Sequence, residues 1–436
     1  MLSLRMHVLK AFCIAMLVLP GIPAHAQAPA APKAKAAAPK TQAAKAQASK
    51  TTAPKATPAA VPVSQGDFSG FISRLWPDAQ RQGVSRKTFD AAFAGVTPDP
   101  SVIALTKKQS EFVKPIWSYL DSAISAARLE RGRAAAEQYA SVLADLERKY
   151  GVDRRAVLGV WGMETNFGSY TGSMDVIRSL ASLAWRRYRD DFFRDELLVA
   201  LRILEEGHVD RKAMRGSWAG AMGQTQFMPS SFMKYAVDYD GDGAKDIWST
   251  VPDALASTAN YLASFGWEAG VPWGVEVTLP AGFDLASATG SREFSTWGDA
   301  GVTRASGSAL PRKGKASLFL PAGIRGPALL ISENFRVIKK YNSSDAYALG
   351  VAHLGDRLLG GGAIRASWPR NDKRLSLEET KDLQRRLVAM GLPVGKIDGR
   401  IGEMSRDSVK KAQIRHGLPA DGYPTHTLLA RIRQKP

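Results

Sequence analysis

The chain has 436 residues and a hydrophobic fraction of 45%, which is enough for two or three domains with buried cores. Its formal net charge is +18, and its only cysteine is Cys13, which excludes a fold built on internal disulfides. Nucleic acid is the usual partner of so basic a chain. We do not expect it here, because the first residues predict export.

The first 26 residues are typical of a secretory signal peptide. Arg5 and Lys10 form a basic N-terminal region, and "AFCIAMLVL" is a short apolar run. The small residues "AHA" before Gln27 form a cleavage site. The run is too short for a permanent membrane span. Cys13 lies near the start of the run, whereas lipid attachment needs a cysteine just after it. We therefore expect a periplasmic protein that is not a lipoprotein.

Residues 27–64 consist mainly of Ala, Pro, Lys, Thr and Gln, with six lysines and no acidic residue. The segment has too few bulky apolar side chains to form a core, so we interpret it as a disordered linker. Its charge leaves two interpretations open. It either attracts anionic envelope material, such as wall-peptide carboxylates or a membrane surface, or is simply a solvated spacer.

From residue 65 to 368 the spacing of apolar residues predicts a mainly helical (α+β) domain. The pattern indicates two short helices, then two longer ones, and further helices after them. These expectations cover residues 67–95, 112–151, 175–207, 253–267 and 344–361. Residues 271–330 are rich in Gly, Pro, Thr and Val, which predicts a small β-rich insertion.

One glutamate lies in an apolar helical segment, "DRRAVLGVWGMET", which Asp153 is expected to cap. Val157, Val160 and Trp161 precede Glu164 by seven, four and three residues, so the four share one helix face. Burial on that face disfavours the ionised carboxyl, and a carboxyl that keeps its proton can act as a general acid. The segment alone leaves the commoner alternative open, a glutamate bonded to a backbone amide or paired with an arginine.

A second motif, "GSWAGAMGQTQFMPSSF", begins at Gly216 and is rich in glycine and alanine, so its backbone can approach a ligand closely. It offers polar groups on Ser217, Gln224 and Gln226, and flat apolar faces on Trp218 and Phe227. Amides beside aromatic rings suit a sugar. The alternative is a tightly packed connection between helices. A third polar and aromatic cluster, "KKYNSSDAYALG", contains Tyr341, Asn342 and Tyr347.

These motifs, together with "DYDGDGAKDIWSTVPDALASTANYLASFGW", resemble the lytic murein transglycosylases of type B over residues 66 to 368. The resemblance implies a goose-lysozyme-like helical catalytic domain. It also implies cleavage of the MurNAc–GlcNAc β-1,4 bond of peptidoglycan without water, leaving a 1,6-anhydro-MurNAc end.

By position, the resemblance makes Glu164 the single catalytic acid and base. It implies a sugar-binding groove formed by Ser217, Gln226, Tyr261, Tyr341, Asn342 and Tyr347, with Tyr119 as a candidate aromatic residue. Ordinary glycosidases use two carboxylates. One suffices if the sugar's own C6 hydroxyl is the nucleophile, and no cofactor is then needed. Two alternatives stay open: a non-catalytic wall-binding scaffold and a lysozyme-type hydrolase.

The segment "DYDGDGAKDIWS" begins like an EF-hand calcium loop. It has Asp238, Asp240 and Asp242 at the first three ligand positions and Gly243 at the turn, but Ser249 replaces the usual bidentate glutamate. Asp246 or Asp253 could supply the missing oxygens, and the resemblance favours Asp253. We expect a structural Ca²⁺, and the alternative is an Asx-rich turn.

Residues 375–436 resemble the small three-helix peptidoglycan-binding domain of wall hydrolases. "IDGRIGEMSRDSVKKAQ" is the most similar portion. We expect this domain to hold the enzyme at the wall. Glycan strands are the expected partner, with cell-wall synthesis or division proteins as further candidates, and we expect a monomer.

Overall fold

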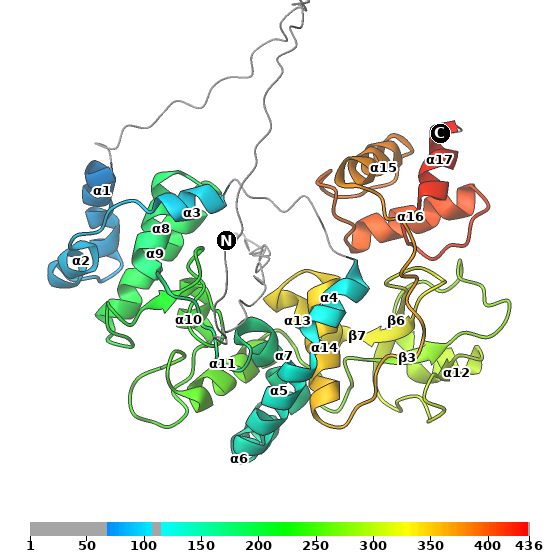
Figure 1. Ribbon diagram of the computed structural model, residues 1–436, viewed down its shortest axis with the longest axis horizontal. Coiled ribbons are helices and arrows are strands. Elements are labelled where there is room, and N and C mark those ends of the chain that lie inside the picture. Colours follow the sequence, from blue (N-terminus) through cyan, green and yellow to red (C-terminus); the bar gives the residue numbers. More distant parts are fainter. Residues whose placement is uncertain (1–67, 107–114, 435–436) are drawn as a thin grey trace, which may run out of the picture.

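The structure is a computed structural model that describes residues 68–106 and 115–434. The predicted signal peptide and linker lie outside these residues. The fold is mainly helical with a small sheet, as predicted (Figure 1). No helix in the described ranges is both long and apolar enough to cross a membrane.

The N-terminal helices pack around the pair α8 and α9, on the left of Figure 1. They are α1 (Phe68–Arg81), α2 (Arg86–Phe93), α3 (Pro100–Leu105), α8 (Val176–Trp185) and α9 (Phe192–Glu205). The side chains of Ser85 and Asp99 accept backbone N–H groups at the starts of α2 and α3, which fixes where these helices begin. The two short helices predicted for residues 67–95 are confirmed.

The central helices include α7 and the helices α5, α6, α11 and α14 that pack directly on it. The central helices are α4 (Ile116–Ala123), α5 (Ala126–Gln138), α6 (Ala140–Tyr150), α7 (Arg154–Thr165), α10 (Pro229–Tyr235), α11 (Val251–Ser264), α13 (Glu333–Tyr341) and α14 (Asp345–Leu358). The prediction of two long helices over residues 112–151 is wrong, because α4, α5 and α6 are three. Ile124 leaves helical geometry, and the Ser125 side chain caps a new helix by accepting the Arg128 N–H.

Helices α7 and α14 cross with their backbones almost in contact. A Cβ atom on Gly159 would lie 2.2 Å from the Val351 carbonyl oxygen, and one on Gly355 would lie 2.1 Å from that of Arg155. Only glycine fits at these two points. The close crossing brings the C-terminal end of α7, where Glu164 lies, toward the N-terminal end of α14.

The β-rich insertion predicted for residues 271–330 is confirmed as an antiparallel sheet in the order β4-β6-β7-β3-β5. Its elements are β3 (Gly274–Thr278), β4 (Arg292–Glu293), β5 (Thr303–Arg304), β6 (Lys315–Phe319), β7 (Ala328–Ser332) and the helix α12 (Phe294–Asp299). Phe294 and Trp297 of α12 are buried with the strands. A second, two-stranded pairing was not predicted, and it joins β1 (Met174–Asp175) to β2 (Arg215–Gly216).

The C-terminal domain contains the three predicted helices α15 (Leu377–Ala389), α16 (Glu403–Arg415) and α17 (His426–Gln434). Each of its two Asp-Gly turns is held by a buried glutamine. Gln384 accepts the Gly399 N–H at 2.8 Å, and Gln413 accepts the Gly422 N–H at the same distance. The domain lies beside the five-stranded sheet (Figure 1), and Ala420 packs with Leu285 and Leu320 of the insertion.

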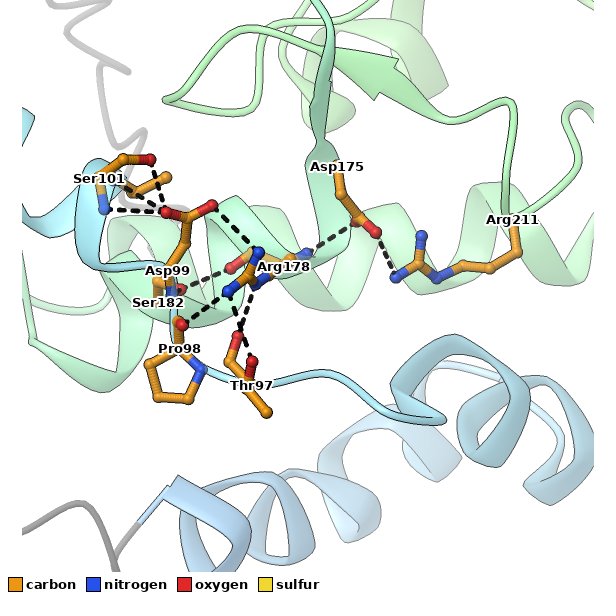
Figure 2. A network of polar contacts seen from close by, with 9 residues as sticks. Thr97, Pro98, Asp99, Ser101, Asp175, Arg178, Ser182 and Arg211 are labelled. Atoms are coloured by element: carbon orange, nitrogen blue, oxygen red, sulfur yellow. Dashed lines mark hydrogen bonds and ion pairs between the residues drawn. The ribbon is translucent and has the colours of Figure 1, made fainter.

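A polar network ties the loop before α3 to α8 (Figure 2). The Arg178 guanidinium donates to the carbonyl oxygens of Thr97 and Pro98 at 2.8 and 2.9 Å, and it pairs with Asp99 at 3.5 Å. The Asp99 N–H donates to Ser182 Oγ at 2.8 Å. One arginine therefore provides most of the polar contacts that hold this loop on α8.

Asp175 extends the network toward α2 (Figure 2). Its side chain caps α8 by accepting the Arg178 N–H, and it pairs with Arg211 at 2.9 Å. Arg211 also donates to the Ala92 carbonyl oxygen at 2.9 Å. The ends of α2 and α3 are thus fixed to α8 through charged groups.

We predict that Arg178→Ala lowers the free energy of unfolding by about 2 kcal/mol, because two backbone carbonyls lose a charged donor and Asp99 loses its cation. Urea unfolding measures the change. The matched control is Arg202→Ala on α9. It removes only a surface pair with Glu206 at the end of that helix and should cost roughly 0.5 kcal/mol or less. Equal effects of the two substitutions would contradict the importance of the network.

Candidate active site

Glu164 lies in the last turn of α7, whose start and end are set by local contacts. The Asp153 side chain caps the start, as predicted, and Asn166 in left-handed conformation (φ 51°) ends the helix. Phe167 is also left-handed (φ 61°), and it packs its buried ring edge-on against Trp161. The chain therefore turns sharply away directly after Glu164.

The Glu164 side chain is partly buried, and its carboxyl accepts a hydrogen bond from Tyr347. The Tyr347 hydroxyl of α14 lies 2.5 Å from Glu164 Oε1. Burial raises the pKa of the carboxyl to about 7, and the hydrogen bond from Tyr347 lowers it by less than burial raises it. The alternative of an arginine pair is not what the geometry favours, because the partner is a neutral phenol.

Two further carboxyls, buried Glu196 and half-buried Asp356, accept hydrogen bonds elsewhere. Glu196 accepts from the N–H and hydroxyl of Ser230, and Asp356 accepts the Trp273 indole N–H at 2.9 Å. Two causes shift the pKa of Glu164, burial and the hydrogen bond from Tyr347. Neither of them involves a second carboxylate. The arrangement therefore suits chemistry that uses one carboxyl.

Three tyrosines from three helices face the same space. The rings of Tyr261 and Tyr341 are 4.6 Å apart, and their hydroxyls donate to the carbonyl oxygens of Lys340 and Thr225. Burial, and then the nearby Glu164 charge for Tyr341 and Tyr347, raises the pKa of these phenols. Burial also raises the pKa of Tyr261. Each phenol stays neutral near pH 7.

The glycine-rich motif lies against the end of α7. The Gln224 side-chain oxygen accepts the Trp161 indole N–H at 2.9 Å, and the Gln224 backbone carbonyl oxygen accepts the Thr165 hydroxyl at 3.1 Å. Gln226 is left-handed (φ 51°) and donates to the carbonyl oxygens of Thr171 and Gly223, both at 2.9 Å. Its buried Oε1 has no hydrogen-bond partner within residues 68–106 and 115–434.

The remaining predicted groove residues differ in exposure. Ser217 is partly exposed, and its Oγ accepts the Ala221 N–H. Asn342 accepts the Ser344 N–H, and Tyr119 of α4 lies beside α14, 3.1 Å from the position of a Cβ on Gly350. Phe227 does not offer the exposed face expected of it. It is only 2% exposed, because its ring packs behind Tyr261 and Tyr341.

The aspartate loop brings together three of the five predicted metal ligands. Carboxylate oxygens of Asp238, Asp240 and Asp253 lie within 4.8 Å of one another. Asp242 and Asp246 are outside this group. Asp246 instead accepts the N–H groups of Trp248 and Ser249 just before α11, so it serves the loop backbone.

The charge on this loop favours a cation. Asp253 is 1% exposed, and its two oxygens accept the N–H groups of Tyr239 and Asp246 at 2.8 Å. Burial, and then repulsion by Asp240 and Asp238, raises the pKa of its carboxyl. Three close oxygens from carboxylates are suitable ligands for a hard divalent ion.

Sequence reasoning missed the residues that join the motifs to one another. The pairing of Trp161 and Thr165 with Gln224 crosses about sixty residues, so no local spacing could reveal it. The available signal was the unusual combination of an indole N–H and a hydroxyl on one buried helix face, since both groups need partners.

Comparison with known proteins decides the family. Residues 67–356 match the family described as Transglycosylase SLT domain, and residues 376–432 match a peptidoglycan binding domain. The chain belongs to the transglycosylase SLT family. It is an enzyme, a lytic transglycosylase of peptidoglycan with a lysozyme-like fold.

Several relatives of this transglycosylase are known. Membrane-bound lytic murein transglycosylase B of Escherichia coli is 33% identical over 312 residues, which cover 66% of this chain and 83% of the relative. The structure of SltB3 from Pseudomonas aeruginosa in complex with NAG-anhNAM-pentapeptide is 48% identical, has a TM-score of 0.79, and covers 84% of this chain and 99% of its own. Slt35 of Escherichia coli, solved in complex with calcium, is 29% identical with a TM-score of 0.56 and covers 68% and 93%.

We predict that Tyr347→Phe raises the pKa of the Glu164 carboxyl in this transglycosylase above about 7, because the carboxylate loses a donor that stabilises its ionised form. Carboxyl NMR titration of protein labelled on its glutamates, with Glu164→Gln for assignment, measures the shift. Tyr261→Phe is the control. Its hydroxyl donates to a backbone carbonyl, so the Glu164 pKa should change little. The same Glu164 pKa in Tyr347→Phe and wild type would contradict the assigned hydrogen bond.

Proposed function

We propose that this transglycosylase cleaves the β-1,4 bond between MurNAc and GlcNAc without water and leaves 1,6-anhydro-MurNAc ends. One observation carries the proposal. The Glu164 carboxyl is partly buried, accepts its hydrogen bond from a neutral phenol, and has a pKa raised to about 7. Such a carboxyl holds its proton near neutral pH and can still ionise during turnover, as a residue that is first acid and then base must.

In the first step the Glu164 carboxylic acid gives its proton to the oxygen between the two sugars. The bond from MurNAc C1 to that oxygen breaks, GlcNAc leaves as an alcohol, and the acetamido group assists at C1. In the second step the Glu164 carboxylate takes the proton of the C6 hydroxyl as the C6 oxygen bonds to C1. Glu164 regains its proton, and between the two steps the Tyr347 O–H stabilises the carboxylate.

We assign the sugar contacts to the groove residues that the resemblance implies. They are Ser217, Gln226, Tyr261, Tyr341, Asn342 and Tyr347, with Tyr119 as the contribution of α4. The buried Oε1 of Gln226, which lacks a partner in the described residues, supports this assignment. A sugar hydroxyl or an N-acetyl N–H would supply the missing donor. Phe227 holds the tyrosines in place from behind.

The proposed organisation follows the sequence: a signal peptide over residues 1–26, a linker over 27–64, the catalytic domain over 65–368 and the wall-binding domain over 375–436. We place the enzyme in the periplasm as a monomer that remodels and turns over the wall. Glycan strands are its partner, and cell-wall synthesis or division proteins are further candidates.

Mass spectrometry of purified sacculi digested with the mature enzyme tests the reaction. The proposal expects anhydro-MurNAc ends. Reducing MurNAc ends would indicate a lysozyme-type hydrolase. Absence of cleavage, with binding retained, would indicate a scaffold.

We predict that Glu164→Gln lowers turnover by about a hundred- to ten-thousand-fold, since the amide cannot transfer the proton. The same change should stabilise the protein increasingly as pH rises. Because the carboxyl has an ordinary pKa of 4.5 and a folded pKa of about 7, the folded state holds the proton longer and loses stability across that interval. Thermal melting at pH 5 and pH 8 measures the trend, and activity within tenfold of wild type would exclude Glu164 as the acid.

We further propose a structural Ca²⁺ at Asp238, Asp240 and Asp253, with no metal needed for the chemistry. The three close carboxylates and the buried, repelled Asp253 support the site. The ion would offset that repulsion and fix the loop before α11, the helix that carries Tyr261. The relative Slt35, solved with calcium, adds support.

Millimolar Ca²⁺ should raise the melting temperature of the mature protein. A native-state ligand at a hundred times its dissociation constant adds about 2.7 kcal/mol. Mg²⁺ should do much less, because it requires a tight octahedral shell. Asp240→Asn should abolish the response. Asp242→Asn distinguishes the two ligand sets: the response persists if the three grouped aspartates hold the ion, and is lost if the EF-hand positions predicted from sequence do. Melting that ignores Ca²⁺ up to ten millimolar would leave the loop as an Asx-rich turn.

A further inference from the structure

The C-terminal domain contacts the catalytic domain at the corner between α13 and α14. The first turn of α16 supplies two charged groups to this corner. Glu403 accepts from Arg336 of α13 at 3.1 Å, and Arg406 pairs with Asp345 of α14 at 2.5 Å. The Arg406 guanidinium also lies 5.3 Å from the ring centroid of Phe319 on β6, a cation–π contact.

Asp345 lies between two cations in a largely buried cluster. Its carboxylate pairs with Lys339 of α13 at 2.8 Å as well as with Arg406, and the side chains of Asp345, Lys339 and Arg406 are 16, 20 and 22% exposed. Burial raises the pKa of the Asp345 carboxyl, but Arg406 and Lys339 outweigh it, so the pKa is lowered. Removing Arg406 would leave a buried carboxylate with one cation, and a buried charge that loses a partner destabilises its surroundings.

This cluster lies at the start of the helix that carries the Glu164 hydrogen-bond donor. Asp345 is the first residue of α14, and the Ser344 side chain caps the helix by accepting the Tyr347 N–H at 3.4 Å. Tyr347, two residues after Asp345, donates to Glu164 at 2.5 Å. The position of the first turn of α14 therefore sets the position of the Tyr347 hydroxyl.

We propose that Arg406 is a positioning residue for the active site, because it fixes Asp345 and with it the turn of α14 that places Tyr347 on Glu164. The C-terminal domain is then part of the catalytic scaffold as well as a wall-binding module. The inference rests on the proposed role of Glu164. A domain that only tethers the enzyme would leave the cleavage of short soluble glycan strands independent of Arg406.

The experiment uses the full mature chain and short soluble glycan strands, so that attachment to the wall does not limit the rate. Arg406→Met should lower kcat by roughly tenfold with little change in KM, because catalysis is sensitive to small displacements of the groups around the reacting atoms. Arg406→Lys should restore part of the rate. The alkaline limb of the pH profile should move to higher pH in Arg406→Met, since a weaker Tyr347 hydrogen bond raises the pKa of Glu164.

The groups that face Glu164 do not interfere with this pH readout. Tyr261 of α11, Tyr341 of α13 and Tyr347 of α14 are phenols whose pKa values are raised, so they stay neutral across the profile. Asp345→Asn combined with Arg406→Met should cost no more than Arg406→Met alone, because both substitutions act through one pair.

Lys410→Met is the matched control. Lys410 lies on the same helix, and it donates at 2.8 Å to the Ala288 carbonyl oxygen of the insertion, whereas Arg406 pairs with Asp345 of α14. Lys410→Met should leave kcat and the pH profile unchanged, and thermal melting verifies that each variant is folded. A folded Arg406→Met with wild-type kcat and pH profile would overturn the inference, as would equal losses in Arg406→Met and Lys410→Met. The proposed function fails separately, if the wild type produces no anhydro ends.

Discussion

The active site depends on one contact, in which a neutral phenol donates to a partly buried carboxyl. Tyr347 reaches Glu164 because α7 and α14 cross at Gly159 and Gly355, where no side chain would fit. Burial without a cationic partner is what raises the pKa to about 7. A salt bridge at the same place would hold the carboxyl ionised and remove its use as an acid.

The rest of the molecule can be understood as support for that contact. The glycine-rich motif holds the end of α7 through Gln224, and the aspartate loop precedes the helix that carries Tyr261. On the other side the sheet leads into α13 and α14, and the C-terminal domain contacts the corner between them through Arg406. Segments far apart in the sequence thus meet around the close crossing of α7 and α14.

The sequence predicted what local spacing determines and missed what distant pairing determines. The helix that Asp153 caps and that carries Glu164 follows from one cap and one apolar face. The cluster that contains Tyr341 and Tyr347 was identified from its polar and aromatic residues. The break at Ser125 was missed because apolar spacing continues across it while the serine caps a new helix. Phe227 was misjudged, since an aromatic residue in a glycine-rich loop can equally pack inward. The pairing of Asp345 with Arg406 joins two domains, and no pattern within either one indicates it.

The central claim is that one carboxyl performs both proton transfers while the substrate's own hydroxyl replaces water. Digestion of purified sacculi in water enriched in oxygen-18 tests this claim most directly, because a hydrolase must place a solvent oxygen on C1 of each new end. The account predicts that mass spectrometry finds new MurNAc ends in the anhydro form with no heavy oxygen. New ends that carry one oxygen-18 atom each would contradict it, because water would then be the nucleophile.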